Sequence, residues 1–250
     1  MTPPVEPSPG PPGRRPEPRV EPGLTTVEPA RGQRPLPPVG PGEPALGPGE
    51  FHRQVGVPPL PTPWPTDPRL DPDLLANGDR RNVVDRFRYW QVSAVSAELD
   101  RDRSPLHIAI ENWQHDLNIG SIVRTANAFN VAGVHIVGRR DWNRRGAMVT
   151  DRYLHVHHHD DVASLAQWAV AEALPLIGLD NIPGSVPIEG FGIPRRCLLL
   201  LGQEGPGLST EAAAACEAVL AITQYGSTRS LNASAAGAIA MFAWALQHRH

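Results

Sequence analysis

The sequence predicts an α/β protein: a mainly parallel sheet with helices on both faces, preceded by a disordered proline-rich tail. One feature of the chain predicts the α/β fold, and a second predicts the tail. From about residue 104 onward, short apolar runs alternate with stretches of helical periodicity, and 23 of the 29 prolines fall within the first 72 residues. The roughly 150 residues of the alternating part are enough for one such domain.

The proline-rich stretch has few aromatic or β-branched residues, so it cannot bury enough apolar surface to offset the entropy of ordering. We expect residues 1–78 to form a disordered, partly polyproline II tail, which could instead dock onto an unknown proline-reading partner. No signal-like or membrane-spanning apolar run follows the first residue. We therefore expect a soluble, cytoplasmic protein.

The charge and the cysteine content limit the possible partners of the protein and its redox compartment. The formal net charge of -3 gives no general basic field for a polyanion, so any nucleic acid must be met by a local patch. Cys197 and Cys216 stand in apolar contexts without metal-ligand spacing. We expect both to be buried free thiols, in keeping with a reducing compartment.

The folded part begins with a helical extension over 79–103, in which residues 81–100 have the spacing of an amphipathic helix. The domain proper covers 104–250. Within it the apolar runs predict strands at 106–112, 134–138, 153–159, 174–179, 196–202 and 218–222. Helices are expected over about 119–130, 161–173 and 232–248.

The segment LLLLGQEGPGLS (198–209) is an apolar strand that enters a glycine-rich bend, a common way to hold a nucleotide. It is not a dinucleotide fingerprint, because the glycine spacing differs and Ile222, not an acid, stands twenty residues after Gly202. It is not a P-loop, because no Lys-Ser/Thr pair follows. Taken alone, the segment could also be a bend that merely turns the chain.

Two further segments change this interpretation: NIGSIVRTANAFNVAGVHIVG (118–138) and ITQYGSTRSLNASAAGAIAMFAWAL (222–246). With 198–209, they resemble in order and spacing the three motifs of the SpoU (TrmH-like) branch of the SPOUT RNA methyltransferases. We call 118–138 motif one, 198–209 motif two and 222–246 motif three. The residues that carry the resemblance are Asn118, Ser121, Ile122, Arg124, Thr125, Ala126, Ala128 and Phe129, then Gly202, Glu204, Gly207 and Leu208, then Ser230, Leu231, Asn232, Ser234 and Ala236.

The resemblance implies a C-terminal trefoil knot and a homodimer, with S-adenosylmethionine held mainly by main-chain groups of motifs two and three. Gly202 and Gly205 allow close backbone approach, and Ile222 and Leu231 offer apolar surface to an adenine ring. The positions that match the family's cofactor contacts are Leu200, Gly202, Ile222, Gln224, Leu231 and Ser234.

The implied reaction is methyl transfer to a ribose 2′-hydroxyl of structured RNA, either tRNA or rRNA, with Arg124, Asn118, Glu204, Asn232 and Ser234 as catalytic residues. An arginine is a poor general base, so Arg124 is better suited to clamp a phosphate and the developing alkoxide. Asn118 could equally cap a helix, and capping is the alternative for Asn232 and Ser234. Glu204 could fix Arg124 or the motif-three loop, or simply be an acid at a helix N-terminus.

The segment GRRDWNRRG (138–146) concentrates four arginines around one tryptophan. We expect RNA contacts there, with phosphates on the arginines and a base stacked on the indole, although a merely solvated loop is the alternative. The residues are Arg139, Arg140, Trp142, Arg144 and Arg145, with Arg229 of motif three as a further candidate.

The run of His155, His157, His158 and His159 invites a metal site. Strand alternation would send these side chains to opposite faces, and no acid or cysteine stands at ligand spacing, so no metal is expected.

A different functional class stays open: a non-catalytic RNA-binding protein on the same fold. That reading predicts loss of Arg124 or Asn232, and both are present.

Overall fold

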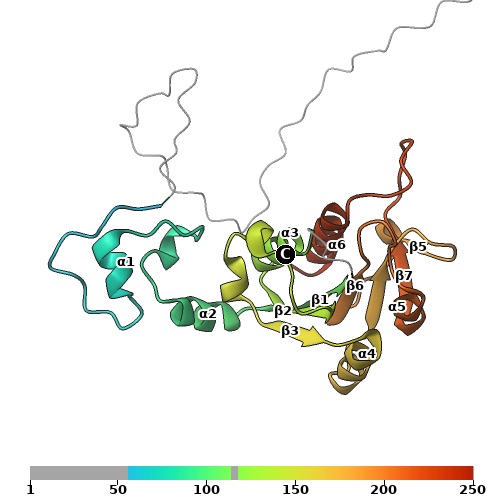
Figure 1. Cartoon of the computed structure of the whole chain (residues 1–250), viewed down its shortest axis with the longest axis horizontal. Coiled ribbons are helices and arrows are strands. Elements are labelled where there is room, and N and C mark those ends of the chain that lie inside the picture. Colours follow the sequence, from blue (N-terminus) through green and yellow to red (C-terminus); the bar gives the residue numbers. More distant parts are fainter. Residues whose placement is uncertain (1–55, 114–117, 250) are drawn as a thin grey trace, which may run out of the picture. The chain divides into compact units, whose positions relative to one another are not determined.

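The computed structural model (Figure 1) describes residues 56–113 and 118–249. The chain divides into two units, Met1–Phe51 and His52–His250, and all described residues belong to the second. Residues 1–55 of the expected tail lie outside the described residues. Their disorder and their unknown partner stay predictions.

The described residues form a seven-stranded sheet in the order β3-β2-β1-β6-β4-β7-β5. Every strand pair in it is parallel, which confirms the predicted sheet. The strands are β1 (Ser104–Asn112), β2 (Val131–Gly138), β3 (Val156–His159), β4 (Leu176–Leu179), β5 (Val186–Pro187), β6 (Cys197–Leu201) and β7 (Ala218–Ala221). Strand order does not fix how the chain is threaded, so the trefoil knot stays a prediction.

Helices cover both faces of the sheet, as predicted (Figure 1). On one face, α3 (Asn118–Ala128) and α6 (Ala233–His248) pack over an apolar cluster that includes Ile108 and Trp244. On the other face, α4 (Val162–Ala171) and α5 (Thr210–Ala215) pack over a second cluster that includes Ala109. Neighbouring residues of β1 thus enter different clusters, as alternation along a strand requires.

The central strand β6 lies between β1 and β4 and is buried along its whole length. Leu199 and Leu201 belong to the α3–α6 cluster, whereas Leu198 and Leu200 belong to the α4–α5 cluster. Burial on both faces explains why this strand reads as an uninterrupted apolar run.

Several short elements were not expected from the sequence: the helix α5, the strand β5, and the 3-10 turns η2 (Arg144–Ala147), η3 (Thr150–Tyr153) and η4 (Ile188–Gly190). The strand expected from residue 153 begins at Val156, because Tyr153 ends η3 and is buried against the N-terminal extension.

Residues 56–78, which were expected to belong to the disordered tail, are ordered instead. They contain α1 (Pro72–Asn77), and Val57 forms a backbone bridge with Asp79. Asp79 is fully buried and accepts hydrogen bonds from the Arg81 guanidinium at 2.7 Å and the Tyr89 amide at 3.0 Å. These polar contacts order a segment that has little apolar surface of its own.

The continuous helix expected over 81–100 is interrupted. A 3-10 turn η1 (Asp85–Phe87) precedes α2 (Val92–Asp100), and Tyr89 between them has a φ of 61°, which no α-helix accommodates. Phe87 and Val95 pack with Tyr153 of η3 in a third apolar cluster. The extension is therefore anchored on the domain by apolar contact.

Four histidines of the three neighbouring strands β1–β3 pack against Trp168 of α4. Nδ1 of His107 lies 3.0 Å from Nε2 of His135, and Nδ1 of His135 lies 2.9 Å from Nε2 of His159. His157 stacks on His135. Burial lowers the pKa of His135 to about 2 and that of His107 to about 4.

His158 points away from this cluster and hydrogen-bonds the Gly138 carbonyl oxygen at 2.6 Å, as the alternation along the strand predicts. Within residues 56–113 and 118–249, no three His, Cys, Asp or Glu side chains form a group that could hold a metal ion.

Cys197 and Cys216 are free thiols, one buried and the other half-buried, and burial raises the pKa of each to about 12. Among the helices of the described residues, none is both long and apolar enough to cross a membrane.

The histidine cluster predicts acid sensitivity. An unfolded histidine titrates near pH 6.5, whereas His107 and His135 stay neutral in the folded protein, so the unfolded chain binds more protons at lower pH. The free energy of unfolding should fall from about pH 6.5 down to about pH 4, by up to about 1 kcal/mol per pH unit for each histidine after allowing for solvent screening. Urea denaturation at several pH values measures this slope.

A His107→Leu variant is the matched control, because it removes one of the two strongly shifted groups. Its slope should be shallower than that of the wild type even if its stability at neutral pH is lower. Equal slopes for the two proteins would contradict this account.

Candidate active site

A cavity of about 430 Å³ opens at the carboxyl ends of the neighbouring strands β4, β6 and β7. Leu179, Leu201 and Leu220, at or next to the last residues of these strands, form part of its lining. Ligand sites of open parallel sheets characteristically lie at this edge. The rest of the lining comes from the loops of motifs two and three and from the residues that follow β4.

Motif two forms a tight turn at this edge. Gln203 and Gly207 exchange two backbone hydrogen bonds of 3.1 Å each. A Cβ on Gly202 would overlap the backbone of Gly207 and Leu208, and Gly207 itself has a φ of +73°. The turn therefore requires glycine where the sequence has it.

The carboxylate of Glu204, within this turn, joins the three motifs. Its Oε2 accepts hydrogen bonds from Nδ2 of Asn118 at 2.9 Å, from Nδ2 of Asn232 at 3.1 Å and from the Ala233 amide at 3.1 Å. Asn232 also donates to Oδ1 of Asn118 at 2.8 Å. One residue from each motif thus meets in a single polar cluster.

Asn232 caps α6 and takes part in this cluster at the same time. Its Oδ1 accepts from the Ser234 amide at 3.0 Å and from the Ser234 hydroxyl at 2.6 Å, while its Nδ2 faces Glu204 and Asn118. Capping and a role in the site are therefore compatible for Asn232. The sequence offered two partners for Glu204, Arg124 and the motif-three loop. The Glu204 carboxylate contacts the motif-three loop, through Asn232 and Ala233.

The sequence reasoning missed two residues that follow β4. Oδ2 of Asp180 accepts from the Leu208 amide at 2.7 Å, and Nδ2 of Asn181 donates to the Arg229 carbonyl oxygen at 3.2 Å. Both residues line the cavity, and between them they hold the loops of motifs two and three. Their place directly after an apolar parallel strand was the available signal.

Of the positions expected to contact a cofactor, Gly202, Ile222, Gln224 and Leu231 line the cavity. Leu200 and Ser234 are not in its lining. Leu200 packs in the α4–α5 cluster, and the next residue of the strand, Leu201, faces the cavity instead. The expected contact of Leu200 with a cofactor stays a prediction.

Arg124 is exposed on α3 and does not line the cavity. In the part of the chain that the structure describes, its guanidinium forms no ion pair and no hydrogen bond. It is therefore available to a ligand that approaches from outside.

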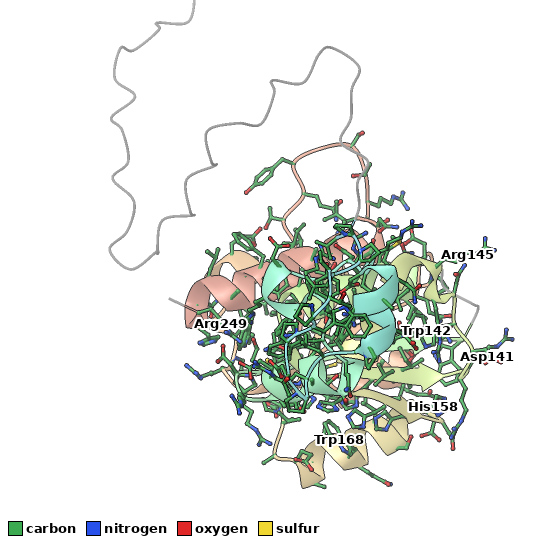
Figure 2. The ribbon with its side chains drawn as sticks, turned by 90° about the vertical axis from the view of Figure 1, so that its left-hand side faces the viewer. Asp141, Trp142, Arg145, His158, Trp168 and Arg249 are labelled. Carbon is green, nitrogen blue, oxygen red and sulfur yellow. The ribbon has the colours of Figure 1, made fainter. Side chains whose placement is uncertain are left out.

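The arginine-rich segment divides into exposed and buried parts. Arg139, Arg140, Arg144 and Arg145 are exposed, and Figure 2 shows Arg145 at the surface. Trp142 is instead buried in the α3–α6 cluster, with the Arg144 guanidinium 5.4 Å from its ring centre. Its expected role as a base-stacking platform is corrected, because the indole is an apolar anchor for the loop.

Arg229 is exposed and lines the cavity, and its neighbour Tyr225 is 94 % exposed. The Arg229 carbonyl oxygen accepts from Gln224 at 3.4 Å in addition to Asn181. This loop therefore presents polar side chains beside the cavity while its backbone is held from two sides.

Residues 105–242, more than half of the chain, match the SpoU rRNA Methylase family. The chain belongs to this family. Three residues of the SpoU family pattern, Asn118, Glu204 and Asn232, meet in one polar cluster, and Glu204 also lines the cavity.

Curated relatives carry related names. A protein of Mycolicibacterium vanbaalenii named an uncharacterized tRNA/rRNA methyltransferase is 32% identical over 194 residues, which cover 73% of this chain and 61% of the relative. One from Mycobacterium sp. strain KMS, with the same name, is 30% identical over the same shares. The chain therefore spans about 61% of the length of these relatives.

Solved structures agree on the SpoU fold. The A. aeolicus TrmH/SpoU tRNA modifying enzyme aligns with a TM-score of 0.56 at 19% identity, covering 62% of this chain and 81% of that one. The SpoU methyltransferase AviRb from Streptomyces viridochromogenes, crystallised with its cofactor AdoMet, aligns with a TM-score of 0.52 at 24% identity and 58% coverage of each chain. At these identities the likeness establishes the fold.

Proposed function

We propose that this SpoU-family chain transfers a methyl group from S-adenosylmethionine to a ribose 2′-hydroxyl of structured RNA, either tRNA or rRNA. The observation that carries the proposal is the meeting of Asn118, Glu204 and Asn232 beside one cavity. The names of the curated relatives and the AdoMet complex of AviRb support the same class of reaction. The cytoplasm, where free thiols such as Cys197 persist, is the expected compartment.

The cavity suits S-adenosylmethionine in size and chemistry. Its volume of about 430 Å³ lies within the usual range of small-molecule sites. Leu201, Ile222 and Leu231 give apolar surface for a flat adenine, and the glycine turn brings backbone amides and carbonyls close to a ligand. When bound, this cofactor supplies a methyl group that an oxygen nucleophile can attack.

The residues of the chain position and polarise the acceptor. A ribose hydroxyl must lose its proton as it attacks. A substrate phosphate held by the guanidinium of Arg124 can accept this proton, and the guanidinium can stabilise the developing alkoxide. The Glu204 cluster fixes the start of α3, which carries Arg124, to the start of α6 and to the cavity turn. Asn118 and Asn232 are then positioning residues for both partners in the reaction.

The RNA would lie along the exposed arginines. Gly120 of α3 and Gly146 of η2 have no room for a Cβ, which would approach the opposing backbone to 2.8 Å and 2.9 Å. The two elements therefore pack backbone to backbone, and Arg144 and Arg145 come beside the helix that carries Asn118 and Arg124. This local basic patch can bind phosphates although the net charge is -3.

The homodimer expected for the family has support in α6. Ile239, Phe242 and Leu246 are exposed at helical spacing and form an apolar stripe on this helix. We propose that a second copy of the chain covers the stripe, since such faces are generally buried against another surface.

A Phe242→Asp variant should therefore shift the protein to the monomer, because the charge would be buried in an apolar contact. Light scattering should give twice the 27.1 kDa chain mass for the wild type and once for the variant. Val170→Asp is the control, since Val170 is 80% exposed on α4 and should leave the mass unchanged. A monomeric wild type would contradict the proposed dimer.

An Arg124→Ala variant should lose RNA methylation and keep its affinity for S-adenosylmethionine, because Arg124 does not line the cavity. Transfer of a labelled methyl group to tRNA or rRNA, with mapping of 2′-O-methyl sites, measures the first quantity. Isothermal titration calorimetry measures the second. Arg101→Ala, an exposed arginine in the N-terminal extension, is the control and should retain activity.

Methyl groups found on bases would refute the ribose specificity. Full turnover by Arg124→Ala, or loss of its cofactor affinity, would show that the residue has been given the wrong role.

A further inference from the structure

Two carboxylates outside the three motifs hold the end of the motif-two turn. The Leu208 amide donates to Oδ2 of Asp180 at 2.7 Å, and the next amide, of Ser209, donates to Oε2 of Glu111 at 2.9 Å. Asp180 directly follows β4, and Glu111 stands near the end of β1. Consecutive amides of the turn are thus fixed by acids from two different strands.

The two acids differ in what else they face. Glu111 is fully buried, and its Oε1 accepts from the indole Nε1 of Trp113 at 2.9 Å. Asp180 is partly exposed and lines the cavity. Its Oδ1 accepts from the Asn181 amide at 2.7 Å. Glu111 therefore contacts the turn and Trp113 and does not line the cavity, whereas Asp180 also faces whatever enters the cavity.

Asp180 keeps capacity for a ligand. A carboxylate has about four lone-pair sites, and the two backbone amides occupy one on each oxygen. No arginine, lysine or histidine of the described residues forms an ion pair with it. The other charged residues of the cavity lining are Glu204, which is hydrogen-bonded to the starts of α3 and α6, and Arg229.

We propose that Asp180 contacts the cofactor and makes the cavity prefer the positively charged methyl donor to its demethylated product. This inference rests on the proposed function. S-adenosylmethionine carries one more positive charge than S-adenosylhomocysteine, and an unpaired carboxylate in a partly enclosed cavity favours the more positive ligand. Methyl transfer removes that charge, so the cavity binds the product more weakly than the methyl donor.

Binding of the two ligands to matched variants tests this role by calorimetry. Asp180→Asn and Glu111→Gln each replace an acid that anchors the same turn by its amide, but only Asp180 lines the cavity. Asp180→Asn should weaken the binding of S-adenosylmethionine by about tenfold, because it removes a negative charge that attracts the sulfonium, and the binding of S-adenosylhomocysteine clearly less. Glu111→Gln should change both affinities by the same factor.

A purely structural Asp180 would lower both affinities equally in Asp180→Asn, and that result would overturn the inference, as would unchanged affinities. If Asp180→Asn does not fold, as judged by circular dichroism, the salt dependence of ligand binding by the wild type still tests the inference. Added salt should lower its affinity for S-adenosylmethionine more than for S-adenosylhomocysteine, and equal responses would refute the inference. A folded wild type that binds neither ligand would instead overturn the proposed function.

Discussion

The carboxylate of Glu204 is the constraint on which the arrangement of the site depends. Asn118 begins α3, Asn232 caps α6, and the two helices come from chain segments more than a hundred residues apart. The parallel sheet delivers both loops to one edge, but a sheet alone does not fix how they meet. Three N–H donors on a single carboxylate oxygen do so, and they bring the turn of motif two to the same point.

The sequence was sufficient for the parts of the structure that follow from periodicity and residue type. Apolar runs such as 106–112 and 196–202 became β1 and β6, because strands buried on both faces must be apolar throughout. The glycines of motif two and the Asn232 cap could also be predicted from the sequence, because their residue types are informative. Each of these residues has few substitutes for its backbone geometry or hydrogen bonds.

The rest depended on packing that a single sequence does not reveal. An uninterrupted leucine run has no alternation, so nothing told which of Leu200 and Leu201 faces the cavity. Trp142 stands among arginines and looked exposed, yet tertiary packing buries it. Asp180 belongs to none of the three motifs, and its contact with the Leu208 amide forms only when β4 lies beside β6. The N-terminal extension is ordered by long-range contacts of Asp79 and Tyr153 that no local pattern predicts.

A double-mutant cycle between Glu204→Ala and Asn232→Ala, read as the free energy of unfolding without ligand, tests the central constraint most directly. If the Glu204 carboxylate gathers the motifs, the two substitutions should be coupled by at least about 0.5 kcal/mol, because each removes the same contacts. Effects that add to within about 0.3 kcal/mol would show that the two residues act independently, and would contradict the account.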